Sequence, residues 1–266
     1  MRNTVLFLLT VTTGAACSAP QPDTDAQDVL VEVATGRVTA PDTVTAGWTR
    51  LRVEEDGEGH ILVAFRLQPQ ASRTQIADFL AALDTARMTP AQTIALGGPE
   101  VGDSGEVIIE LALGRYVLAC LSRGTDGHRH ALQGEWHVLE AALTTHRSAP
   151  PDSVIELSMI DFIYHTDVPW PSGSRVIKIV NSGREDHQVR IERLREGVTV
   201  MDWINAEGDE DVSEPIAGVA RTSPGQTVYL PLDLTPGTYV LYCLIPAAST
   251  GTPHAEIGMI RGITVE

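Results

Sequence analysis

The chain has 266 residues, of which 43% are hydrophobic, 20% are charged and 5% are aromatic. This is the composition of an ordinary globular protein, and it excludes collagen, coiled coils and disordered tails. There are 35 acidic residues against 19 Lys and Arg, and the formal net charge is -16. Such a surface offers little to bind phosphates, so we expect no nucleic-acid partner.

The first residues have the pattern of an export signal. A basic residue is followed by a short apolar run at 5–11 and by small residues at 14–16. Cys17 comes next, as in a bacterial lipobox, so we expect a signal peptide at 1–16 and a lipidated Cys17 that begins a polar tether at 17–27. The alternative is that Cys17 is only the last residue of the cleaved peptide. No apolar stretch is long enough to span a bilayer. We therefore expect a periplasmic or cell-surface lipoprotein that touches the membrane only through its lipid anchor.

The second half of the chain repeats the first. Residues 114–120 (GRYVLAC) match residues 237–243 (GTYVLYC), and the other matches lie at a similar offset of about 123 to 127 residues. Two tandem copies of one domain, at 28–146 and 152–266, are the simplest explanation. Between them lies a Pro-rich segment that would interrupt any regular element.

Strand signals dominate both copies. Short β-branched runs alternate apolar and polar residues, as in 175–180, and they are bounded by Gly, Pro, Asn and Asp. Ser72 with Gln75, and Thr199 with Asp202, have the spacing of helix capping boxes. The sequence therefore predicts an all-β protein of two Greek-key β-sandwich domains, each with one short helix.

Each copy keeps one cysteine at the end of its matched strand, Cys120 in the first and Cys243 in the second. A disulfide within either copy is therefore impossible. In an oxidising compartment three explanations remain open: a bridge between the two copies, two buried inert thiols, or metal ligation.

The second copy surrounds its cysteine with further metal-ligand types. His187 lies in a strand after a Gly turn, and His254 and Met259 follow Cys243 in the next loop. Thiolate and imidazole together hold both Cu(I) and Cu(II), and a weak axial thioether disturbs them little during electron transfer. Zinc more often takes a fourth strong ligand. This set of residues therefore indicates copper.

The same order of residues resembles the cupredoxin, or blue type 1 copper, family. Members share a Greek-key sandwich and a strand His followed far downstream by Cys, His and Met. The resemblance implies that His187, Cys243 and His254 form the strong plane of one type 1 copper site and that Met259 is its weak axial ligand. Gln188 follows the first His, where many members carry an Asn.

The first copy keeps His60, Cys120 and His130 but has Glu135 where the axial Met would stand. His128 competes with His130 for the ligand role. A carboxylate binds Cu(II) harder and disfavours Cu(I), so we expect this second site to be altered or lost.

These features predict an exported electron carrier that works through one copper, with a redox protein as its partner. A basic partner would suit the acidic surface. Copper nitrite reductases and multicopper oxidases place a His beside the site Cys to wire a second copper, whereas Ala119, Leu121, Tyr242 and Leu244 stand there in this chain. We therefore expect no enzymatic activity. The alternative function is a metal-free β-sandwich used for binding or scaffolding at the cell surface.

Overall fold

The structure is a computed structural model. It describes residues 26–57, 59–84, 94–100, 104–143, 148–153, 155–166, 169–206 and 211–266. The predicted signal peptide, Cys17 and most of the tether lie outside the described residues. Among the residues that are described, no helix is both long and apolar enough to cross a membrane.

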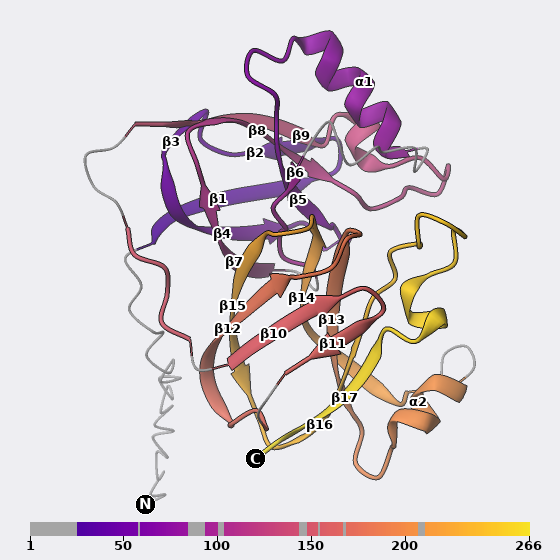
Figure 1. Ribbon diagram of the computed structural model, residues 1–266. Helices are drawn as coiled ribbons and strands as arrows, with labels where there is room; N and C mark the ends of the chain where they lie inside the picture. Colours follow the sequence, from indigo (N-terminus) through magenta and orange to yellow (C-terminus); the bar gives the residue numbers. More distant parts are fainter. Residues whose placement is uncertain are drawn as a thin grey trace, which may run out of the picture.

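The first half of the chain folds into two facing sheets and a helix (Figure 1). Its elements are β1 (Gln27–Ala34), β2 (Arg37–Thr39), β3 (Thr43–Thr45), β4 (Gly47–Glu55), β5 (Leu62–Arg66), α1 (Arg73–Asp84), β6 (Ile94–Ala95), β7 (Ser104–Leu111), β8 (Gly114–Cys120), the 3-10 helix η1 (His130–Gln133) and β9 (Trp136–Ala142). One sheet has the order β2-β1-β4-β7, and the other has the order β3-β9-β8-β5-β6.

The second half has a matching set of elements. These are β10 (Ile155–Ile160), β11 (Ile163–His165), β12 (Gly173–Asn181), β13 (His187–Leu194), α2 (Val200–Asn205), β14 (Ser213–Thr222), β15 (Thr227–Leu234), β16 (Gly237–Tyr242), the 3-10 helix η2 (His254–Ile257) and β17 (Ile260–Val265). One sheet runs β11-β10-β12-β15 and the other runs β14-β13-β16-β17. The prediction of an all-β sandwich fold is confirmed.

Corresponding strands pair in the same way in the two halves. β1 pairs parallel to β4 and antiparallel to β2, and β10 likewise pairs parallel to β12 and antiparallel to β11. In β1 the side chains of Val29, Val31 and Val33 are buried while their neighbours are exposed or half-buried, which is the period-two pattern of a strand with one face on a core.

Both predicted capping boxes open helices. The Ser72 amide donates to Gln75 Oε1 at 2.8 Å and the Gln75 amide donates to Ser72 Oγ at 3.2 Å, directly before α1. At α2 the Asp202 amide donates to Thr199 Oγ1, and the Thr199 amide donates to the Asp202 carboxylate. Each pair satisfies amides that the first turn of a helix leaves without partners.

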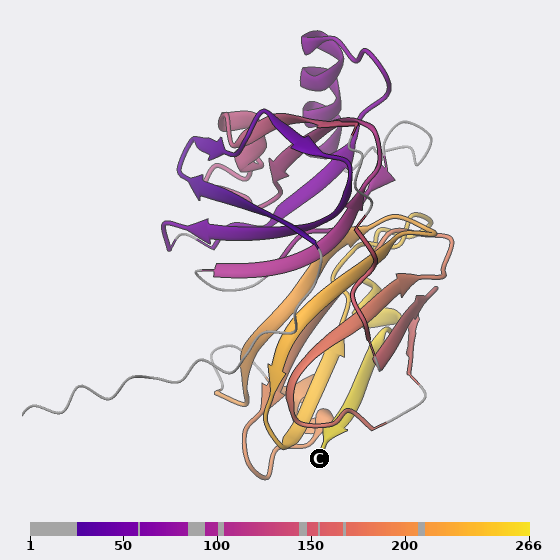
Figure 2. The ribbon, with the colours of Figure 1, turned by 90° about the vertical axis from the view of Figure 1, so that its left-hand side faces the viewer.

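The two halves join edge to edge. Strand β7 pairs antiparallel with β15 through Ile108 and Ile109, so that one sheet of each half continues into the other as eight strands. On the opposite face, the segment at 94–100 hydrogen-bonds to β14. Figures 1 and 2 show the halves stacked across this junction. A single buried apolar cluster runs through both.

Candidate metal centres

Three donor side chains of the second half meet at one buried point. His187 begins β13, Cys243 directly follows β16, and His254 begins η2. The Nδ1 atoms of the two histidines are 3.1 Å apart, and Cys243 Sγ lies 3.5 Å from His254 Nδ1. All three residues are completely buried, and their donor atoms lie within 4.8 Å of one another. These are three of the four residues that the sequence predicts as ligands of this site.

Backbone hydrogen bonds hold the loop between Cys243 and Met259 in place. The Met259 amide donates to the His254 carbonyl at 2.9 Å, and the Cys243 amide donates to the Met259 carbonyl at 3.3 Å. Gly258 between them has a φ of 114°, a left-handed conformation that suits glycine. The Met259 side chain is fully buried. The loop therefore fixes the three residues Cys243, His254 and Met259 relative to one another.

Carboxylates hold the outer nitrogens of the two imidazoles. His187 Nε2 lies 3.1 Å from Asp161 Oδ1, and His254 Nε2 lies 3.2 Å from Glu185 Oε2. Asp161 Oδ1 also accepts hydrogen bonds from the backbone amides of Arg184 and Glu185, at 2.7 and 3.2 Å. A carboxylate on Nε2 keeps the proton there and turns Nδ1 inward as a lone-pair donor, which is the usual support of a metal-bound histidine.

Burial sets the protonation of these donors. It raises the pKa of the Cys243 thiol to about 11. It also lowers the pKa of His187, against the opposing effect of the Asp161 carboxylate. For Asp161 itself, burial would raise the pKa, but the amides of Arg184 and Glu185 and the His187 ring together bring it below its usual value. The imidazole of His187 is thus a neutral donor at pH 7, and a metal that binds Cys243 must displace its proton.

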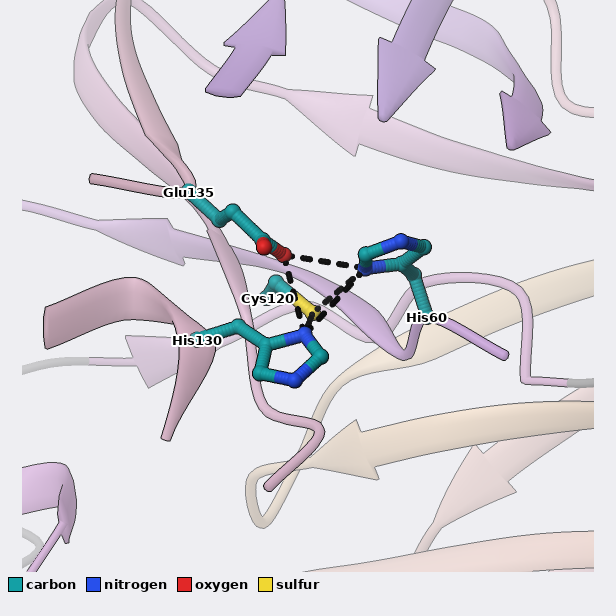
Figure 3. A group of neighbouring side chains, drawn as sticks. All are labelled: His60, Cys120, His130 and Glu135. Carbon is teal, nitrogen blue, oxygen red and sulfur yellow. Dashed lines mark hydrogen bonds and ion pairs between the residues drawn. The ribbon is translucent and has the colours of Figure 1, made fainter. Parts of the chain in front are cut away.

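The first half brings four donors together (Figure 3). His60 precedes β5, Cys120 ends β8, His130 begins η1 and Glu135 directly precedes β9. The distances to Cys120 Sγ are 3.5 Å from His60 Nδ1 and 3.8 Å from His130 Nδ1, and the two Nδ1 atoms are 3.4 Å apart. Glu135 Oε2 lies 2.9 Å from His60 Nδ1 and 3.1 Å from His130 Nδ1. His128, the competing candidate, lies outside this group.

Glu135 occupies the position that Met259 has in the other half. The Glu135 amide donates to the His130 carbonyl at 3.2 Å, and the Cys120 amide donates to the Glu135 carbonyl at 3.0 Å. The equivalent two bonds hold Met259 in the second half. Burial raises the pKa of Cys120 to about 11, as for the other thiol. The two loops therefore share one backbone frame and differ in the side chain that it carries.

Both cysteines are free and buried. The bridge between Cys120 and Cys243, which the sequence left open, is thus not formed, and each thiol lies against the histidines of its own half. In the second half, two imidazoles and a thiol that are all completely buried fit a copper ion, which takes nitrogen and sulfur ligands in both oxidation states.

Sequence reasoning missed the supporting carboxylates. Asp56 Oδ1 lies 3.0 Å from His60 Nε2 and plays the part that Asp161 plays for His187. It also missed Glu100, which crosses the junction from the first half and accepts hydrogen bonds from Gln188 at 3.0 Å and Arg190 at 2.8 Å. Acidic residues are common on this chain, and no sequence pattern marks Asp56, Glu100, Asp161 or Glu185. Only the folded loops bring them to the histidines or across the junction.

No family model matches the sequence, and neither does any curated protein. Solved structures do resemble it. Reduced auracyanin from Roseiflexus castenholzii is 23% identical over 42% of this chain and 94% of that chain, with a TM-score of 0.31. Blue copper oxidase from Nitrosomonas europaea is 10% identical over 91% of this chain and 86% of that chain, with a TM-score of 0.26. The Cu-containing nitrite reductase from Thermus scotoductus SA-01 is 13% identical over 92% of this chain and 68% of that chain, with a TM-score of 0.26. These likenesses concern the fold.

The comparisons correct one expectation. We expected no enzymatic activity, because neither Cys120 nor Cys243 has a histidine beside it. The structures that match over nine tenths of this chain, however, include an oxidase and a nitrite reductase, which are enzymes. The missing histidine concerns only one path by which electrons pass between a first and a second copper ion. It has no bearing on a reaction at either cluster of donors, so the exclusion of catalysis is withdrawn.

Proposed function

We propose that this is an exported copper protein of two tandem cupredoxin-like domains, at 28–146 and 152–266, that transfers single electrons through a type 1 site in its second domain. His187, Cys243 and His254 supply the strong ligands and Met259 the weak axial one. The observation that carries the proposal is the convergence of three buried donor atoms within 4.8 Å of one another. Copper bound there supplies exchange of one electron between Cu(I) and Cu(II).

The surrounding residues support such an exchange by keeping the donors in place. Asp161 and Glu185 hold the outer nitrogens of His187 and His254, and backbone bonds hold Cys243. Donors that are positioned before the ion arrives move little when its charge changes. Complete burial of the three ligands keeps water from joining the site. Both effects lower the cost of rearrangement that accompanies transfer of an electron.

A partner could approach over the exposed rim of the same loop. Leu244, directly after Cys243, is 43% exposed, and Ile257 at the end of η2 is 42% exposed. Glu256 beside Ile257 is exposed too. An apolar rim with an acidic neighbour, on a chain of net charge -16, suits a basic redox protein. We propose that such a partner docks here.

Copper reconstitution tests the site directly. The purified full-length protein is stripped of metal, given one equivalent of Cu(II), and examined by visible absorption and EPR spectroscopy. We expect an intense absorption from thiolate-to-copper charge transfer and a narrow copper hyperfine splitting. Cys243→Ser should abolish both features, while Cys120→Ser, the matched change in the other half, should leave them. A wide splitting of the square-planar type, or an absorption that survives Cys243→Ser, would overturn the proposal.

The proposed location has its own test. The chain expressed in a bacterial host with a lipoprotein pathway should partition with membranes, and mass spectrometry should find a lipidated Cys17 at its amino terminus. Cys17→Ser should release the protein into the soluble periplasmic fraction. Recovery of the unchanged chain, with its first 16 residues attached and in the cytoplasm, would contradict export.

A further inference from the structure

We propose that the first half holds a second and redox-inert metal centre, in which His60, Cys120, His130 and Glu135 bind one zinc ion. The inference does not depend on the copper site of the other half. It starts from Glu135, a carboxylate that is only 1% exposed and that lies between two imidazoles. A buried carboxylate needs a positive partner. A divalent ion at the centre of the four side chains would supply one.

The donor atoms lie close to the spacing of a tetrahedral zinc site. Zinc lies about 2.0 to 2.3 Å from nitrogen, oxygen and sulfur ligands, so tetrahedral donors are about 3.3 to 3.8 Å apart. The three distances among His60 Nδ1, His130 Nδ1 and Cys120 Sγ are 3.4 to 3.8 Å and lie in this range. The two distances from Glu135 Oε2 to the histidines, 2.9 and 3.1 Å, are slightly shorter. Small shifts of side chains would therefore be enough for all four to reach one ion.

Glu135 is held so that one oxygen remains available. Its Oε1 accepts a hydrogen bond from the Gly36 amide at 2.9 Å, and its Oε2 points at the two histidines. The loop frame is the one that carries Met259 in the second half. At this position the first half thus offers a strong and anionic fourth ligand, which zinc favours, in place of a weak thioether.

Charge balance separates the two centres. The Cys120 thiolate and the Glu135 carboxylate carry two negative charges, which a divalent ion neutralises. Among the side chains that would touch the ion in the second half, only the Cys243 thiolate is anionic. Its charge balances Cu(I) and leaves Cu(II) with one positive charge, which the Asp161 and Glu185 carboxylates beyond the histidines partly offset. Net charge inside a protein is costly. The first centre therefore favours an ion that stays divalent, and the second tolerates a change between the two states of copper.

The outer shell agrees with a metal in the first centre. Asp56 Oδ1 lies 3.0 Å from His60 Nε2 and fixes the ring with Nδ1 inward, as Asp161 does for His187. Loss of such an outer contact typically weakens metal binding by about 10- to 100-fold. Asp56→Asn should weaken zinc binding by that factor and leave copper binding unchanged.

The test is a competition between two metals. Metal-free full-length protein receives one equivalent each of Cu(I) and Zn²⁺ under anaerobic, reducing conditions and is then desalted. Its copper and zinc contents per chain are measured by inductively coupled plasma mass spectrometry. We expect one copper and one zinc per chain. Glu135→Gln should reduce the affinity for zinc, measured against a chromophoric chelator, by at least about 100-fold, since it removes a ligand rather than an outer contact. Glu140→Gln, the same change at an exposed site on β9, should have no effect.

Several results would overturn the inference. These are two coppers and no zinc in the wild-type protein, zinc binding that Glu135→Gln leaves intact, or zinc that is lost with Cys243→Ser instead of Cys120→Ser. Copper retained by the second half shows that a variant is folded. If Glu135→Gln loses copper as well, that variant is not folded and cannot serve as the test. The zinc affinity of Asp56→Asn then decides, because an unchanged affinity in Asp56→Asn would count against the zinc site. Absence of copper with zinc retained would reject the electron-transfer function alone.

Discussion

Gly183 lies where the second centre has no room for a side chain. A Cβ atom at this position would stand 2.4 Å from Asp161 Oδ1 and 2.7 Å from His187 Nε2. These two atoms are the partners of the 3.1 Å contact that orients the first histidine. Gly183 is not among the glycines with positive φ, so an alanine would fit the backbone. The effect of Gly183→Ala therefore comes from crowding alone.

The size of the effect follows from these distances. A carbon and an oxygen atom need roughly 3.4 Å, so Asp161 Oδ1 must retreat by about 1 Å and the His187 ring by somewhat less. The distance between Asp161 Oδ1 and His187 Nε2 then exceeds the limit of a hydrogen bond. Metal sites tolerate errors of only about 0.2 Å in ligand position. We expect copper affinity to fall by about 10- to 100-fold and the free energy of unfolding of the metal-free protein to fall by about 1–3 kcal/mol.

Copper affinity is measured by competition with a chelator of known affinity, and stability by urea unfolding of the metal-free protein. Gly225→Ala is the matched control. Gly225 has a φ of 78° with open space around it, so alanine there strains the backbone without touching the centre. It should cost about 1–2 kcal/mol of stability and leave copper affinity unchanged. A Gly183→Ala protein that binds copper as tightly as the wild type would refute the assigned role of the Asp161 contact.

Three further predictions concern the thiols, the junction and the axial position. Folding raises the pKa of Cys120 and Cys243 to about 11, so the metal-free protein loses stability as pH rises from about 8.5, the value of a free thiol, towards 11. Alkylation at pH 8 should be far slower in the native chain than in the unfolded one, and equal rates would disprove the burial. Glu100→Ala removes the buried carboxylate that accepts hydrogen bonds from Gln188 and Arg190. It should lower the free energy of unfolding by about 1–3 kcal/mol in urea titration, whereas an unchanged value would show that the junction does not need this contact. Met259→Leu should keep copper bound and raise its reduction potential in a potentiometric titration, because the thioether stabilises Cu(II); an unaltered potential would remove Met259 from the ligands.

The donors were within reach of sequence reasoning because their order is linear. A histidine in or just before a strand, the cysteine, the loop histidine and the residue at the axial position appear in that order in both halves, and helix caps such as Ser72 with Gln75 are local. Sequence could not decide between His128 and His130. The structure does so through the loop, in which the His130 amide donates to the Ser122 carbonyl at 2.9 Å and sets the ring inside.

The supporting contacts were out of reach for a physical reason. Asp161 and His187 lie 26 residues apart and meet only because the fold brings the end of β10 beside the start of β13. The pairing of β7 with β15 joins segments still farther apart, and nothing in either strand specifies its partner. Contacts of this kind depend on the packed fold and carry no signal of their own in a single sequence.

The most direct test of the account is anomalous diffraction from crystals of the protein reconstituted with copper and zinc. Data collected on either side of the copper absorption edge should place a copper ion between the Nδ1 atoms of His187 and His254 and the sulfur of Cys243. A copper ion bound at any other place, or crystals of copper-loaded protein with no anomalous peak among these three atoms, would contradict it.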